Sequence, residues 1–206
     1  MLIRDAVVDD VNCIVNVHVQ AFEGFFLTQL GPGFVAELYK AFATRPAGIL
    51  RIICDEEGNV LGFAGGTIDP EAFYRGLRKE KSIIFLVKML PGLMRHPLLF
   101  FKKLWYALFY TGEKPSSLDD SALLSSIAVI PGMAGKSLGK KLLEDFEREV
   151  KKRGLRSLFL TTDKYGNDKV VGFYLRSGYS IESEFKQADG REMLRFVKIF
   201  DGEKNE

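Results

Sequence analysis

The sequence predicts a domain of the α/β class, in which strands and helices alternate along the chain. Three segments carry this prediction: a hairpin at 49–68, a strand that enters a helix through a glycine-bearing loop at 123–153, and a further strand and helix at 157–179. The chain has 206 residues, of which 47% are hydrophobic, so it can bury one core of good size. We therefore expect residues 1–200 to form a single domain and residues 201–206 to form a disordered tail.

The first third of the chain is expected to hold three strands and two helices. The pattern predicts a short strand at 2–4, a helix at 6–22 with acidic residues at its start, and a second helix at 35–43. Two strands follow at 49–54 and 60–68. The acidic turn between these strands contains Gly-Asn, which favours a tight hairpin.

The last third opens with an apolar strand at 127–130. A proline and a glycine at 131–132 end this strand, because proline lacks an amide donor and glycine adopts unusual dihedral angles. The helix that follows has an apolar face at helical spacing, formed by Leu138, Leu142, Leu143, Phe146 and Val150. We expect further strands at 157–162, 180–185 and 192–200.

The loop before this helix has the composition of a phosphate site. Gly135, Ser137 and Gly139 allow a ligand to approach the main chain closely, and the unpaired amides of the first helical turn would point at it. The helix dipole and the cations Lys136 and Lys140 favour an anion at the same place. Such loops are also common as ordinary strand-to-helix turns, so a diphosphate site is one of two interpretations of this motif alone.

A second motif follows the strand at 157–162. Asn167 is followed by Tyr174, and Gly178 and Tyr179 then close a helix into the next strand. Together and in this order, the two motifs resemble the GNAT superfamily of acetyl-CoA-dependent N-acetyltransferases. The motifs of that superfamily read Q/R-x-x-G-x-G/A and N-x-x-A-x-x-x-Y-x-x-x-G-F/Y.

Three positions depart from the superfamily pattern. Ala134 replaces the Arg or Gln of the first motif, Ser137 replaces its first glycine, and Val170 replaces a small residue in the second. The resemblance implies a mixed, mostly antiparallel twisted sheet with helices on both faces. It also implies that the protein is an acyltransferase with acetyl-CoA as co-substrate, whose fourth and fifth strands splay apart to admit the pantetheine arm.

The same resemblance assigns roles to residues of both motifs. By position, the main chain of Ile127, Ala128 and Val129 would bind the pantetheine arm. The diphosphate would be bound at Ala134, Gly135, Lys136, Ser137, Leu138, Gly139 and Lys140. Tyr174 takes the position of the general acid that protonates the leaving thiolate, and its alternative role is that of a core tyrosine. Asn167 either bonds the pantetheine or neighbouring backbone, or caps the following helix.

The acceptor is expected to be a primary amine on a small or amphipathic molecule, for example an amino sugar on a lipid or nucleotide carrier. The aromatic loop at 22–27 and a later basic segment favour such an acceptor over a protein tail. Glu23, Asp119, Asp120 and Asp163 are candidates for the general base, and each is also explained as a solvated carboxylate. Neither histidine has metal-ligand spacing to a partner, so no metal is expected.

Residues 69–117 form an insertion, because the superfamily passes almost directly from the third strand to the fourth. Nine Lys or Arg stand against three Glu between residues 70 and 117, among large apolar side chains. Pro91, Pro97 and interspersed cations are expected to divide the segment into two or three helices without a transmembrane span. Four interpretations stay open: a lid over the acceptor site, which we favour among the functional ones, a homodimer surface, a peripheral membrane contact through residues 71–110, or helices packed on the domain with a solvated basic face.

Bulk properties exclude some classes of function. The net charge of +2 and the lack of a basic recognition motif argue against nucleic acid as a partner. Cys13 and Cys54 are expected to be buried apolar groups, and the N-terminus lacks the features of a signal peptide or an anchor, so a cytoplasmic location is expected. Two alternatives to an enzyme are a non-catalytic acyl-CoA-binding or regulatory module, and a membrane-surface interaction protein that uses the insertion.

Overall fold

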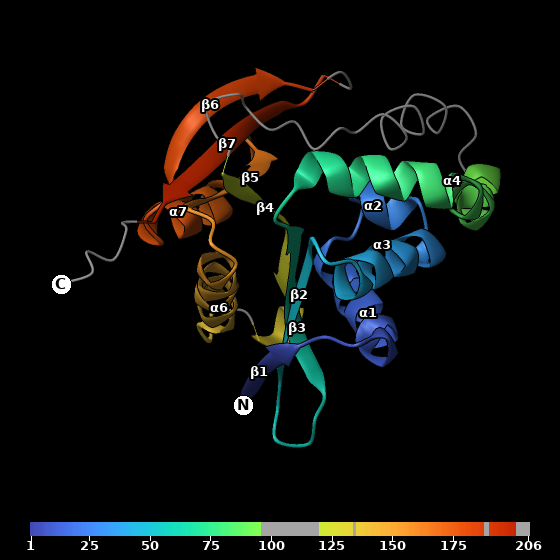
Figure 1. Ribbon diagram of the computed structural model, residues 1–206, viewed down its shortest axis with the longest axis horizontal. Coiled ribbons are helices and arrows are strands. Elements are labelled where there is room, and N and C mark those ends of the chain that lie inside the picture. The colour runs from blue at the N-terminus through green and yellow to red at the C-terminus, as the bar shows by residue number, and fades with distance from the viewer. Residues whose placement is uncertain (96–119, 134, 188–189, 201–206) are drawn as a thin grey trace.

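A computed structural model describes residues 1–95, 120–133, 135–187 and 190–200 of the chain. Its centre is a seven-stranded sheet in the order β1-β2-β3-β4-β5-β7-β6 (Figure 1). Neighbouring strands are antiparallel except β4 and β5, which are parallel. Helices lie on both faces of this mixed sheet, which confirms the predicted fold class.

The elements agree with the expected order along the chain. The first eight are β1 (Leu2–Asp5), η1 (Val8–Asp10), α1 (Val11–Ala21), α2 (Phe26–Gln29), α3 (Pro32–Thr44), β2 (Gly48–Cys54), β3 (Val60–Thr67) and α4 (Pro70–Arg95). The others are β4 (Ser121–Val129), η2 (Pro131–Met133), α6 (Leu138–Lys152), β5 (Ser157–Asp163), α7 (Asp168–Arg176), β6 (Ser180–Lys186) and β7 (Glu192–Ile199).

The first helix starts later than the sequence predicts. The chain before Val11 forms the short 3-10 helix η1, in which the amide of Val7 donates to the Asp10 carboxylate at 2.8 Å. A carboxylate that binds the amide at the start of a helix follows the capping-box pattern, and here the turn that it closes is 3-10 instead of α.

Helix α4 occupies the start of the insertion and continues through Pro91 to Arg95, so the break expected at this proline is wrong. A proline removes one main-chain hydrogen bond, and the early turns of α4 compensate by burying Phe73 and Leu77 in the core. The rest of the insertion from residue 96 to 117, Ala134 and the tail at 201–206 lie outside the described residues. Within the described part of the chain, no helix has the length and apolar character needed to cross a bilayer.

Buried side chains form two clusters. The helices that contribute to them lie on opposite faces of the sheet (Figure 1). The first, which we call the α3 face, unites α1, α3 and α4 with the sheet, and fully buried Tyr39 and Phe63 lie within it. The second, the α6 face, unites α6 and α7 with the sheet around Phe146 and Phe196. Burial of these large side chains is the main force that holds the helices on the sheet.

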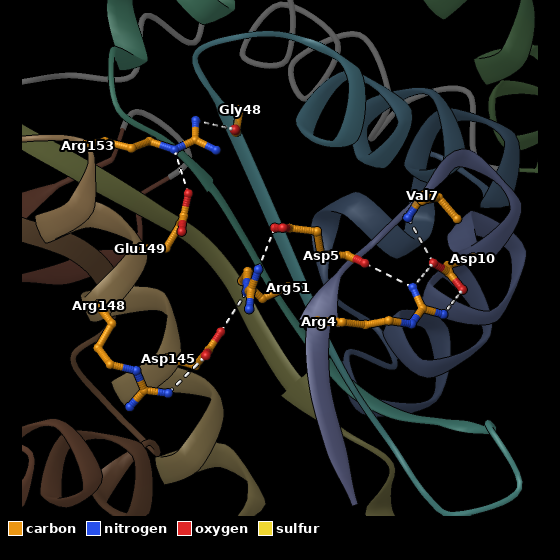
Figure 2. Close-up of polar contacts among 10 residues, drawn as sticks. All are labelled: Arg4, Asp5, Val7, Asp10, Gly48, Arg51, Asp145, Arg148, Glu149 and Arg153. Atoms are coloured by element: carbon orange, nitrogen blue, oxygen red, sulfur yellow. Dashed lines mark hydrogen bonds and ion pairs between the residues drawn. The ribbon is translucent and has the colours of Figure 1, made fainter.

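Ion pairs connect the ends of the early strands with α6 (Figure 2). Arg51 on β2 donates through Nε to Asp145 on α6 at 2.6 Å, and its other end bonds Asp5 of β1. Arg4 binds Asp10 with both of its terminal nitrogens, at 2.7 and 2.8 Å. The orientation of α6 is therefore fixed by charge contacts as well as by packing.

Candidate active site

The parallel pairing of β4 with β5 stops soon after it starts. Leu123 opposite Phe159 is the last pair, and β5 continues beside β7 as far as Asp163. Among the described residues, the rest of β4 from Leu124 to Val129 has no partner strand on that side. A central strand of the sheet thus keeps one unpaired edge, as the resemblance implies.

Ile127 and Val129 present their main-chain groups at this unpaired edge. The amide of Ile130 donates to β3 at 2.9 Å, and the carbonyl oxygen of Ala128 also faces β3, because a Cβ added to Gly62 would lie 2.7 Å from it. Main-chain groups alternate between the two edges of a strand, so those of Ile127 and Val129 point the other way. Of the three residues predicted to bind the pantetheine arm, Ala128 is therefore turned toward β3.

The loop that leads into α6 keeps the backbone of a glycine motif. Gly135 has a φ of 83°, and Ser137 has a φ of 60° at the position where the superfamily has its first glycine. Among the described residues, Ser137 alone combines a side chain with a positive φ. No described carbonyl accepts a bond from the amides of residues 137–140, whereas the Lys136 amide donates to Met133 at a long 3.4 Å. Most donors of the predicted cradle are thus available to a ligand.

The charges around this loop favour an anion. The first turn of α6 contains no acidic residue, and Lys136, Lys140 and Lys141 are exposed beside it. Lys140 reaches Glu144 only at 3.8 Å. Cations at the positive end of a helix dipole are unfavourable by themselves and favourable once an anion binds. The predicted diphosphate site therefore has both the donors and the charge that the group needs.

Helix α7 lies against the start of α6, since a Cβ added to Gly139 would lie 4.0 Å from the ring of Phe173. Asn167, directly before α7, donates through Nδ2 to Thr162 Oγ1 at 2.6 Å and to the carbonyl of Asp163 at 3.2 Å. Its side chain makes no cap bond to the helix. Of the roles considered for Asn167, the structure therefore shows the bond to neighbouring backbone, which ties α7 to the end of β5.

Tyr174 is 6% exposed and packs on the α6 face. Its ring centroid lies 5.7 Å from that of Tyr179 and 5.6 Å from that of Phe196, and no described residue hydrogen-bonds its hydroxyl. Burial raises the pKa of Tyr174 well above the usual range of a tyrosine. The hydroxyl is therefore protonated at neutral pH, and its proton is not used by a described protein partner.

A β-bulge lies at the point where β4 has just left β5. The register with β3 places Gly65 opposite Ser126 and Gly66 opposite Leu124, so Ser125 is the extra residue. Ser125 is only partly buried, although it belongs to a central strand. This segment immediately precedes the unpaired edge at Ile127.

Polar side chains from two helices approach the bulge on the α3 face. The hydroxyl of Tyr74 on α4 lies 3.1 Å from Ser125 Oγ. Burial raises the pKa of Tyr39 on α3, and its side-chain contact with Ser126 opposes that rise. His18 on α1 lies behind them, with Nδ1 2.7 Å from the Tyr39 hydroxyl. Burial lowers the pKa of His18 to about 4, so its imidazole is neutral at pH 7.

No pattern in the sequence indicated His18, Tyr39 and Tyr74 as candidate site residues. Each lies on the apolar, buried side of its helix, where a polar side chain needs a partner. A polar residue at a predicted core position is a signal that a buried polar contact exists. The sequence does not show which residue would be its partner.

The candidate bases lie elsewhere. Glu23 and Asp120 are exposed, Asp163 pairs with Arg191 at 3.2 Å, and Asp119 lies outside the described residues. No hydrogen bond or ion pair joins the first three to the described residues of the bulge. The described part of the chain likewise holds no group of three or more His, Cys, Asp or Glu that could bind a metal ion.

Comparisons with known proteins connect this geometry to one family. Residues 106–179 match the family model described as the acetyltransferase (GNAT) family. This range includes the unpaired edge of β4, the loop before α6 and both motifs of the sequence analysis. The comparison with curated proteins gives no match.

Solved structures share the fold over nearly the whole chain. Ribosomal-protein-alanine N-acetyltransferase from Brucella melitensis has a TM-score of 0.64 at 16% identity, covering 97% of this chain and 100% of its own. Aminoglycoside 6′-acetyltransferase type Ii has a TM-score of 0.62 at 15% identity, covering 97% of both chains. PaiA N-acetyltransferase from Thermoplasma acidophilum, solved with coenzyme A, has a TM-score of 0.58 at 13% identity, covering 97% of this chain and 98% of its own.

Proposed function

We propose that the chain is an acetyltransferase of the GNAT family, whose model matches residues 106–179, and that it moves acetyl from acetyl-CoA to a primary amine of a small or amphipathic acceptor. One observation carries the proposal: the unpaired edge of β4 leads directly into the available amides at the start of α6. A single stretch of chain from 127 to 140 would then bind both the thioester arm and the diphosphate of one molecule.

The residues around this edge have clear tasks in acyl transfer. Acetyl-CoA, when bound, supplies an acetyl thioester whose carbonyl carbon the amine attacks, and the carbon–sulfur bond then breaks to release a thiolate. A main-chain amide of Ile127 or Val129 would stabilise the negative charge that develops on the carbonyl oxygen. Tyr174 would give its proton to the leaving sulfur, and the proton that the amine loses would pass to water.

The loop after α1 supports a small or amphipathic acceptor. Phe25 is 47% exposed in this loop, and Phe22 and Leu27 are partly buried beside it. Exposed aromatic surface of this kind binds the apolar part of a ligand. An amino sugar on a lipid or nucleotide carrier fits this description, and cations of the insertion would suit its phosphate. Equal turnover of phosphorylated and phosphate-free amines would contradict the proposal that the acceptor carries a phosphate.

Calorimetric titration with acetyl-CoA, followed by thiol release in the presence of an amine panel, tests the proposal. Two variants with the same charge change locate the site: Lys140→Glu at the start of α6 and Lys152→Glu at its end. We expect the first to weaken acetyl-CoA binding by about tenfold or more and the second to change it little, because the effect of charge falls off within one helical turn. Equal effects of the two variants would contradict a diphosphate site at this helix start.

The non-catalytic alternative predicts a different outcome of the same experiment. A binding or regulatory module would take up acetyl-CoA and release no thiol with any amine. Turnover with at least one amine would exclude it. Cys54 is buried as expected, whereas Cys13 is exposed, so the burial expected for Cys13 is wrong. Both are free thiols, which fits the reducing cytoplasm that we propose as the location.

A further inference from the structure

We propose that the hydroxyl groups of Tyr39 and Tyr74 position the bulged segment Ser125–Ser126 of β4 for acyl transfer, which makes helix α4 of the insertion a working part of the active site. The inference rests on the proposed function, because it concerns the strand edge assigned to the thioester. Both tyrosines act through β4 and are therefore positioning residues.

The bulge is the part of β4 that the sheet holds least firmly. A bulged residue lacks a ladder partner of its own, and here it follows the last pair with β5, Leu123 opposite Phe159. Ser126 is paired with Gly65 of β3, whereas Ser125 has no such pair and therefore depends on its side chain for orientation. Ile127 comes next in the chain, so any rotation of the bulge changes where its amide points.

Two tyrosines supply the missing contacts from the helices. Tyr74 bonds Ser125, and its ring packs edge-on against Phe73, with ring centroids 5.3 Å apart. Tyr39 is fully buried, and its ring lies 4.9 Å from that of Phe63. Rings held in this way present their hydroxyls with little freedom, which is what a positioning group needs.

His18 holds the hydroxyl of Tyr39 in place. Its Nδ1 lies 2.7 Å from the Tyr39 hydroxyl, and its Nε2 is buried without a hydrogen-bond partner among the described residues. Ser126 contacts the Tyr39 side chain, so we expect Ser126 to donate to Tyr39 and Tyr39 to donate to Nδ1, which would satisfy both hydroxyls. The neutral imidazole thus anchors a line of hydrogen bonds that starts at β4 and ends inside α1.

The variants Tyr39→Phe and Tyr74→Phe test the inference, because each removes one hydroxyl and keeps its ring. We expect kcat to fall by about tenfold in each, since a catalytic edge loses its orientation, while the Kd for acetyl-CoA changes less than about twofold. Melting temperature is measured in parallel. The wild-type protein must bind acetyl-CoA and release thiol in the same assay, and its failure to do so would count against the proposed function itself.

Tyr179→Phe is the matched control. Its hydroxyl is also buried and donates to Glu147 at 2.9 Å, but on the α6 face away from the bulge. We expect this variant to lower the melting temperature and to keep the wild-type kcat. A kcat within twofold of wild type in both Tyr39→Phe and Tyr74→Phe would overturn the inference, as would an equal fall of kcat in the control.

A double-mutant cycle keeps the inference testable where a tyrosine variant fails to fold. Ser125→Ala removes the other end of the Tyr74 contact with a smaller change. We expect Ser125→Ala and Tyr74→Phe to lower kcat by similar factors and the double variant to be no worse than either, because both break one hydrogen bond. Multiplicative losses, or no loss in Ser125→Ala, would show that Tyr74 does not act through Ser125.

Discussion

The α6 face and the α3 face meet the same strand, β4, with different chemical groups. On the α6 side, the groups offered to a ligand are main-chain amides, at the unpaired edge beside Ile127 and in the first turn of α6. On the α3 side they are side-chain hydroxyls, which reach the bulge from Tyr39 and Tyr74. Under the proposed function, main-chain amides would bind the cosubstrate, whereas positioning of the strand would depend on particular side chains.

The largest effect should come from removing a main-chain donor on the α6 side. Ile127→Pro deletes the amide at the unpaired edge and leaves the β3 pairing intact, because that amide points away from β3. We expect kcat/KM to fall on the order of 100- to 1,000-fold, the usual loss for one oxyanion donor. Thiol-release kinetics measure the effect.

Ala128→Pro is the control for this change, since the amide of Ala128 faces β3 and supports the sheet. It should lower the melting temperature far more than Ile127→Pro does. The opposite order of melting temperatures would show that the two edges of β4 are assigned the wrong way round.

Tyr174→Phe tests the side chain on the α6 face that we propose as the general acid. We expect kcat to fall by about 100-fold with little change in the Kd for acetyl-CoA, because only proton transfer is lost. Burial raises the pKa of Tyr174, so the wild-type rate should not decline on the alkaline side as far as about pH 10. A rate profile that falls near pH 8 would point to another acid.

Acid should weaken the α3 face through His18. Its pKa is about 4 in the folded protein and about 6.5 when unfolded, so the unfolded state binds the proton first as the pH falls. The free energy of unfolding should then drop by about 2.5 kcal/mol between pH 7.5 and 4.5, as urea titrations can measure. The same titration of His18→Asn, which keeps a polar atom near the position of Nδ1, should show a much smaller drop.

Asp10 contributes little in that pH window. Its pKa is lowered mainly by its bond to Arg4, so in the folded protein it takes up its proton below the ordinary range of an aspartate. An equal drop in the wild type and in His18→Asn would show that His18 is not the titrating group.

The smallest effect concerns the loop before α6. Ser137 has a φ of 60°, which strains a residue with a side chain, so Ser137→Gly should raise the free energy of unfolding by about 0.5–1 kcal/mol. Gly135→Ala should lower the free energy of unfolding, because the φ of Gly135 is 83° and a side chain is strained there. Steric contact is not the cause, since a Cβ at this position would meet no atom within 4 Å. Urea unfolding compares the two, and a destabilised Ser137→Gly variant would contradict the strain.

The sequence predicted the fold well because its signals are local. Apolar periodicity and turn residues gave the order of elements and the confirmed fold class. They also identified the face of α6 that is buried, formed by Leu138, Leu142, Leu143, Phe146 and Val150. These local signals gave the wrong helix boundaries at two places. At η1, the Asp10 carboxylate accepts a bond from the Val7 amide, and at Pro91 helix α4 continues through the proline.

The candidate site divides in the same way. The glycine loop and the Asn167–Tyr174 motif are short and contiguous, so the sequence displays them. The network of His18, Tyr39 and Ser126 joins residues that come together only after α1, α3 and β4 have packed. Ser125 lies at the bulge because of the register between β3 and β4, and no local sequence pattern predicts that register.

Arg51 has a practical consequence for handling the protein. It bonds Asp5 near the amino end of the chain and Asp145 on α6, so a disturbance at the first strand is passed to the helix whose amides would hold the cosubstrate. An affinity tag fused ahead of Leu2 adds bulk beside this contact. Purification by a carboxy-terminal tag should therefore preserve coenzyme affinity better than purification by an amino-terminal one.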